Sequence, residues 1–168
     1  NQEMPFAPCG HEIAKQQFEL PVYEKGQTPE EQAAGLTLKE DAARAEITGE
    51  HVKVVFNKVN GQLLTYEVDG KTLIAQGPSM NLDRAAIDND MYKVQDWYEK
   101  YFLHRQQEQL EAFEINECET YTEVCAHTHF STLSMAFGFK GCYCYRIFGD
   151  VTMTLDLKMK GFKYSKFI

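Results

Sequence analysis

The chain lacks the features that mark membrane and nucleic-acid-binding proteins. No apolar run in its 168 residues approaches the ~20 residues that a membrane helix needs, and its first residues do not resemble a signal peptide. Positive charge is scarce, with 17 Lys and Arg against 25 Asp and Glu, and the formal net charge is −8. Such a surface repels a phosphate backbone on average. We therefore expect neither membrane nor nucleic acid among its partners.

The short motifs of nucleotide, cofactor and nucleophile sites are missing as well. The chain has no Gly-x-Gly-x-x-Gly, no Walker loop and no Gly-x-Ser-x-Gly. Its 25 acidic residues are too numerous and too easily solvated to single out a catalytic pair. The residues alone therefore predict no catalytic group and no cofactor.

Cysteine is present in an odd number. A chain long enough to build a core, with an odd count, favours reduced thiols over a disulfide framework, so we expect a cytoplasmic protein. Cys142 and Cys144 are two apart on an expected strand, which is too far for a comfortable bridge between them. The five cysteines are Cys9, Cys118, Cys125, Cys142 and Cys144.

Cys125, His127 and His129 recur at a spacing of two, so one face of a strand carries all three. If the strand with Cys142 and Cys144 pairs beside it, five zinc-type ligands gather. The close Cys-x-x-Cys spacing is absent, however, and cysteine often serves as a small buried apolar residue. We favour the structural interpretation and expect no metal, but whether Cys125, His127 and His129 bind one stays open.

The apolar pattern indicates a mainly β chain. Three short strands joined by Asn60-Gly61 and Asp69-Gly70 read as a meander, because these dipeptides are strong hairpin signals. Residues 36–47 fit alternation and are assigned to strand, and strands resume at Phe113. The expected strands with clear boundaries are 51–58, 63–68, 71–75, 142–148 and 151–159.

One helix is expected, over residues 96–110. Asp96 is a suitable cap, no Gly or Pro interrupts, and the pairs Trp97/Tyr101 and Tyr98/Phe102 have the i,i+4 spacing for stacking. Residues 151–159 alternate five apolar residues with polar ones, as in a strand with one buried face. Together these patterns predict an antiparallel β-sandwich with one helical excursion.

A polar block interrupts this pattern at Arg84-Ala85-Ala86-Ile87-Asp88-Asn89-Asp90. It has little to bury, and Asp and Asn favour turns, so a simple turn is the first interpretation. The block also resembles the Arg-x-Pro-x-Asp-Asn-Asp segment of β-galactosidases in glycoside hydrolase family 2.

Other blocks follow in the order that this family uses. Residues 10–20 resemble the last strand of the immunoglobulin-like domain after the catalytic barrel, and residues 56–63 resemble the opening hairpin of the large β-sandwich that follows. Residues 145–150 resemble a later strand and turn of that sandwich. The resemblance implies an end of the immunoglobulin-like domain at 1–21, a linker at 22–35, and the first half of a galactose-mutarotase-like super-sandwich at 36–168.

The resemblance also implies a function. The parent would hydrolyse terminal β-D-galactosides with retention, using glutamates, Mg²⁺ and Na⁺ on a barrel that lies before Asn1, so this fragment would be inactive and hold no cofactor. It would pack on that barrel, contribute to a homo-oligomer and lend a loop to the substrate entrance. The expected substrate-binding residues are Asp88, Asn89, Asp90, Met91, Tyr92, Lys93 and Val94.

Two other functions fit the same sequence. One is a free-standing carbohydrate-binding β-sandwich, which predicts sugar affinity in isolation. The other is a structural domain in which the polar block is only a turn.

Overall fold

A computed structural model describes residue 8 and the ranges 15–18, 35–132 and 137–163. The chain divides into two units, Asn1–Glu30 and Glu31–Ile168. In the first unit, residues 15–18 have no regular secondary structure and Phe18 is exposed. The rest of the expected closing strand, and all of the expected linker except Gly35, lie outside the described residues.

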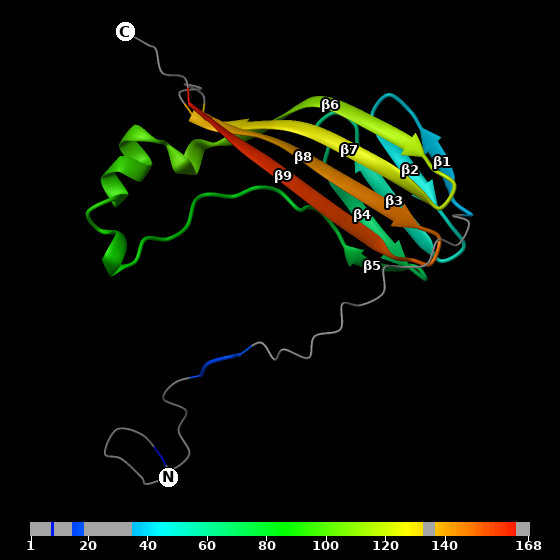
Figure 1. Ribbon diagram of the computed structural model, residues 1–168, viewed down its shortest axis with the longest axis horizontal. Coiled ribbons are helices and arrows are strands. Elements are labelled where there is room, and N and C mark those ends of the chain that lie inside the picture. Colours follow the sequence, from blue (N-terminus) through cyan, green and yellow to red (C-terminus); the bar gives the residue numbers. More distant parts are fainter. Residues whose placement is uncertain (1–7, 9–14, 19–34, 133–136, 164–168) are drawn as a thin grey trace. The chain divides into compact units, whose positions relative to one another are not determined.

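The second unit contains two antiparallel sheets, each with its strands in sequence order (Figure 1). The expected meander is confirmed as part of the five-stranded sheet, and residues 36–47 are indeed extended, as a hairpin. The strands of this sheet are β1 (Thr37–Glu40), β2 (Arg44–Thr48), β3 (Val52–Asn57), β4 (Leu63–Val68) and β5 (Lys71–Ile74). The four-stranded sheet comprises β6 (Gln107–Glu117), β7 (Tyr121–Ser131), β8 (Phe137–Phe148) and β9 (Met153–Lys163).

The core lies between the two sheets, as expected for a β-sandwich. Phe56 of β3 and Tyr145 of β8 are both almost fully buried, with their rings edge to face at a centroid distance of 5.0 Å. Burial also raises the pKa of Tyr145 to about 12, because an apolar environment disfavours the phenolate. The buried core residues are Ala45, Ile47, Val52, Val54, Phe56, Leu63, Val124, Ala126, Tyr143, Tyr145 and Ile147.

The predicted helix over 96–110 is wrong in extent. In the part of the chain that the structure describes, the helical elements are short turns, at η1 (Asp88–Asp90), η2 (Asp96–Lys100) and η3 (Leu103–Arg105). Phe102 has a left-handed φ of 49°, which ends η2, and β6 already begins at Gln107 rather than at Phe113. The expected i,i+4 stacking is replaced by ring contacts of Tyr98 with His104 and of Tyr101 with Phe137 of β8.

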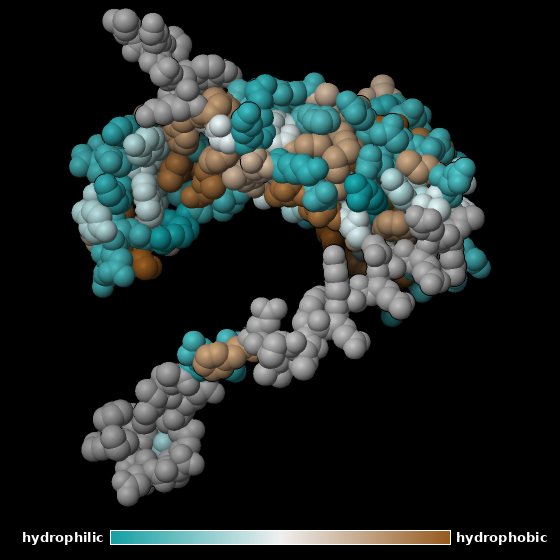
Figure 2. All heavy atoms as spheres, viewed as in Figure 1, coloured by the Kyte–Doolittle hydropathy of each residue, from teal (hydrophilic) through white to brown (hydrophobic). Residues whose placement is uncertain are grey.

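The expected apolar face of residues 151–159 is only partly covered. Val151, Met153 and Met159 pack against the core, whereas Leu155 and Leu157 are 39% and 47% exposed. β9 is the edge of its sheet, and Figure 2 shows brown, hydrophobic residues along this edge.

Among the described residues, no helix has the length and the apolar character that crossing a membrane requires.

Gly61, in the β3–β4 turn, lies directly against the second sheet. A Cβ at this position would lie 2.7 Å from Leu110 Cδ1 and 2.9 Å from Ala126 Cβ, and its φ is +75°. Gly70, in the β4–β5 turn, has nearly the same φ, +73°, but open space around it. An alanine at Gly70 would therefore meet backbone strain alone, whereas an alanine at Gly61 would meet the same strain and also crowding at the interface between the sheets.

We predict that Gly70→Ala lowers the free energy of unfolding by about 1 kcal/mol, through backbone strain. Gly61→Ala should lower it by roughly 3 kcal/mol, because overpacking is added to the same strain. Urea denaturation of both variants and of the parent chain measures the difference. Equal losses in the two variants would contradict the close packing of this turn on the second sheet.

Candidate functional site

The seven expected substrate-binding residues lie on the excursion that connects β5 to β6. This segment leaves β5, coils through the three helical turns and returns into β6 (Figure 1). Asp88, Asn89 and Asp90 form η1, residues 91–93 continue it in hydrogen-bonded turns, and Val94 is helical and leads into η2. The backbone N–H of Lys93 donates to the Asp90 carbonyl at 2.7 Å. The structure therefore places all seven residues in one compact stretch outside the sheets.

A paired ionic contact holds this stretch together. Arg84 Nη1 lies 2.7 Å from Asp90 Oδ2, and Nη2 donates to Asp90 Oδ1 at 2.9 Å. Bidentate guanidinium–carboxylate pairs of this kind fix geometry as well as charge. Asp90 Oδ2 also accepts from the Ile87 backbone N–H at 3.0 Å, so a single carboxylate closes the loop from residue 84 to residue 90.

The same contacts set the ionisation of Asp90. The hydrogen bonds from Arg84 and then from the Ile87 N–H hold the pKa of the Asp90 carboxyl below its ordinary value of 3.8. The Arg84 guanidinium also lies 5.3 Å from the centre of the Trp97 ring, which is the one tryptophan of the chain. The charged pair thus joins η1 to η2.

The remaining residues of this stretch are presented outward. Met91 and Tyr92 are 68% and 79% exposed, and Asp88, Asn89 and Lys93 are exposed as well. Val94 is half-buried. Of the seven residues, Asp90 is therefore a positioning group, whereas the exposed amide, carboxylate and aromatic side chains are available to a ligand or a neighbouring domain.

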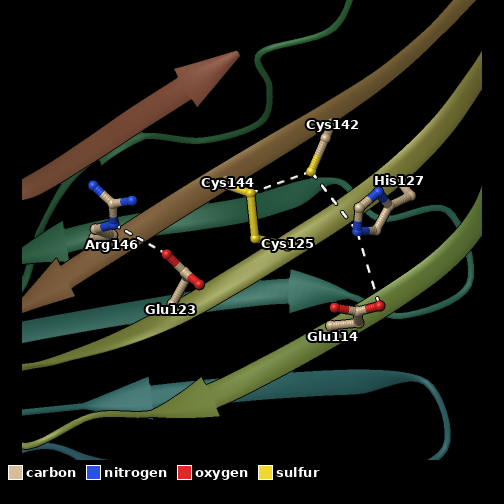
Figure 3. Close-up of a disulfide and its surroundings, with 7 residues drawn as sticks. All are labelled: Glu114, Glu123, Cys125, His127, Cys142, Cys144 and Arg146. Atoms are coloured by element: carbon tan, nitrogen blue, oxygen red, sulfur yellow. Dashed lines mark hydrogen bonds and ion pairs between the residues drawn. A yellow bond between two sulfur atoms is a disulfide. The ribbon is translucent and has the colours of Figure 1, made fainter. Parts of the chain in front are cut away.

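A second cluster lies on the outer face of the four-stranded sheet (Figure 3). Cys125 of β7 is directly opposite Cys144 of β8, with Cα atoms 4.2 Å apart, and the two form a disulfide. The prediction that all cysteines are reduced thiols is therefore wrong for this pair. An odd cysteine count does not exclude one bridge when two strands bring a cross-strand pair face to face.

Cys142 and His127 form the next opposite pair on the same face of these strands. Cys142 Sγ lies 3.2 Å from Cys144 Sγ and 3.9 Å from His127 Nε2. His127 Nε2 in turn lies 3.9 Å from Glu114 Oε1 of β6. As expected, Cys142 does not bridge to Cys144, and it is a free cysteine.

His129 does not join this cluster, although it shares the face of the strand. Its ring packs against Phe162 at a centroid distance of 4.8 Å, and its Nδ1 lies 3.8 Å from Glu111 Oε1. Of the five potential ligands noted in the sequence, the structure gathers the sulfur atoms of Cys125, Cys142 and Cys144 within 4.8 Å of one another, and places His127 beside Cys142. The sequence analysis made this clustering conditional on the pairing of the two strands, and β7 does pair with β8.

The family described as β-galactosidase small chain matches residues 48–166, which include strands β3 to β9 and the excursion but leave out β1 and nearly all of β2. The chain belongs to this family. The match confirms that the chain corresponds to a β-galactosidase small-chain region.

Two β-galactosidases are similar to this member of the family over about half of its length. The enzyme of Priestia megaterium is 32% identical over 93 residues, which are 54% of this chain and 9% of the relative. That of Streptococcus thermophilus is 31% identical over 85 residues, which are 51% of this chain and 8% of the relative. The chain thus matches less than a tenth of the length of these curated relatives.

We predict that Asp90→Asn loosens the excursion, because the amide cannot reproduce the ionic pair with Arg84. The Ile87 amide should exchange its hydrogen faster, and the emission of Trp97 should change. In the unsubstituted chain, the ionised Asp90 carboxylate stabilises the folded excursion. This stabilisation is fully present above pH 3.8 and is lost as the pH falls through the lowered pKa of Asp90. The variant should show no such transition.

Asp88→Asn is the matched control, since it removes an exposed carboxylate from the same turn. It should leave the exchange of the Ile87 amide and the Trp97 emission unchanged. If Asp88→Asn and Asp90→Asn behave alike, the Arg84–Asp90 pair does not organise the loop.

Proposed function

We propose that this chain is a non-catalytic region of a β-galactosidase of glycoside hydrolase family 2 that cleaves terminal β-D-galactosides with retention. The β-galactosidase activity proposed for the parent enzyme is supported by the match to the small-chain family and by the two β-galactosidase relatives. In this proposal the catalytic glutamates belong to a barrel elsewhere in a cytoplasmic parent enzyme. The chain alone is inactive.

The observation that carries the proposed role is the excursion closed by Arg84 and Asp90. It is long, polar and anchored by its own ionic pair, and it presents Asp88, Asn89 and Tyr92 away from the sheets. A loop built in this way serves contact with something outside the sandwich better than it serves the core. We assign that contact to the substrate entrance of the barrel, with residues 88–94 on the substrate side.

The second part of the proposal concerns the edge of the four-stranded sheet. β9 leaves Leu155 and Leu157 substantially exposed on the side that faces the core layer. Edge strands with exposed apolar residues readily pair or pack with further chain. We propose that this edge contributes to packing within the parent enzyme or between its copies in a homo-oligomer.

The role of the loop is tested in the whole parent enzyme. Asp88→Asn should raise KM for lactose about tenfold, the effect of losing one hydrogen bond of about 1.4 kcal/mol. Glu119→Gln removes an exposed carboxylate from the β6–β7 turn and should leave KM unchanged. Equal KM values for the unsubstituted enzyme and its Asp88→Asn variant would overturn the proposal that the loop contacts the substrate.

The isolated chain provides the complementary measurement. Titration with galactose and lactose, followed by the emission of Trp97, should give a flat response, because recognition requires the barrel. A saturable shift would favour the alternative of a free-standing carbohydrate-binding module.

A further inference from the structure

We propose that the reduced chain binds one thiophilic divalent ion, such as Zn²⁺, through Cys125, His127, Cys142 and Cys144. Neither the family nor the proposed role of the loop calls for this site. It is drawn from the way in which β7 and β8 place four side chains on one face of their sheet (Figure 3). Three cysteines and one histidine are an established donor set for structural zinc.

The four residues occupy the corners of a rectangle on paired strands. Cys125 faces Cys144 across the ladder, and His127 faces Cys142 two residues further along. Residues that are opposite, or two apart on one strand, share a face and converge above it. The register itself therefore supplies four ligands without any contribution from a turn.

The separations suit a tetrahedral ion. A Zn–S distance of about 2.3 Å places the sulfur atoms of a tetrahedral site about 3.8 Å apart. In the structure Cys142 Sγ and Cys144 Sγ are 3.2 Å apart, and all three sulfur atoms lie within 4.8 Å of one another. The corresponding N···S separation is about 3.6 Å, against 3.9 Å between His127 Nε2 and Cys142 Sγ. To hold the ion, the sulfur atoms of Cys125 and Cys144 must separate after reduction, and the His127 ring must turn toward the three cysteines.

The surroundings provide both access and charge. A depression of about 340 Å³ lies beside the cluster and is lined by His127, Cys142 and Lys158, among others. The Glu114 carboxylate, 3.9 Å from His127 Nε2, adds negative charge next to the imidazole nitrogen that would bind the ion. Three thiolates and one dication leave a net charge of −1, which the Lys158 ammonium at the rim partly offsets.

The disulfide and the metal site are alternative states of the same sulfur atoms. A low-molecular-weight dithiol reduces the Cys125–Cys144 bond by supplying two electrons and two protons, and is itself oxidised to a disulfide. The ion then displaces one proton from each of the three thiols and accepts a lone pair from neutral His127. The oxidised chain retains Cys142 alone as a thiol in the cluster and should not bind the ion.

The test uses the full chain carrying Cys9→Ser and Cys118→Ser, so that no other cysteine contributes. The reduced protein is titrated anaerobically with Co²⁺, and Zn²⁺ is then added as a competitor. We expect one equivalent of Co²⁺ to give thiolate-to-metal charge transfer and the visible bands of tetrahedral cobalt, both removed by Zn²⁺. A spectrum of octahedral cobalt without charge transfer would overturn the proposal.

Matched variants assign the ligands. Loss of an outer-shell partner typically weakens metal binding about 10- to 100-fold. His127→Gln removes a direct ligand and should weaken binding by more than this. His104→Gln, on the excursion, should leave the affinity for the ion unchanged. Cys142→Ser should abolish the tetrahedral spectrum and yet leave the Cys125–Cys144 disulfide able to form.

Alkylation provides a readout that does not depend on the spectrum. In the unsubstituted reduced chain, Zn²⁺ should protect Cys125, Cys142 and Cys144 from iodoacetamide and leave the exposed Cys118 reactive. Equal alkylation of the three cysteines with and without Zn²⁺ would contradict the site, whatever the stability of the variants.

Discussion

The packing of Phe56 against Tyr145 is the contact on which the rest of the structure depends. It joins the centres of the two sheets, and both rings are almost fully buried. Since side chains alternate along a strand, burying Tyr145 also sends its neighbours Cys144 and Arg146 to the outer face. A slip of one residue in β8 would exchange the two faces and dismantle the core together with the sulfur cluster.

The excursion obeys a different constraint. It connects the two sheets but its helical turns contain no fully buried residue, so its shape rests on polar contacts and contacts between exposed or half-buried rings. The Arg84–Asp90 pair closes its first half, and the ring contact of Tyr101 with Phe137 ties its second half to β8. Substitutions of the exposed residues in this loop should therefore leave the packing of the core unchanged.

Much of the fold was predictable because its strongest signals are local. Asn60-Gly61 and Asp69-Gly70 each specify a tight turn, and the alternation of residues 151–159 specifies a strand. The helix over 96–110 failed because residues 107–110 have good helical propensity but pair with residues 128–131 of β7, far away in the sequence. Long-range pairing of this kind overrides propensity.

For the candidate sites, too, the sequence predicted what local patterns or resemblance indicate and missed what depends on contacts in the fold. Residues 88–94 were located by resemblance, yet the pairing of Arg84 with Asp90 follows no local spacing rule and required the structure. The disulfide depended on the register between β7 and β8, which the sequence does not give. A shift of one residue would have placed Tyr143 or Tyr145 opposite Cys125 instead of Cys144.

Both sheets form one cooperative unit through this shared core, and native-state hydrogen exchange of Phe56→Ala is the measurement that tests this unity. The amides of β3 and of β7 and β8 should lose protection by the same amount, because removing the ring destabilises both layers together. If β7 and β8 keep the protection of the unsubstituted chain while β3 loses it, the two sheets are separate units.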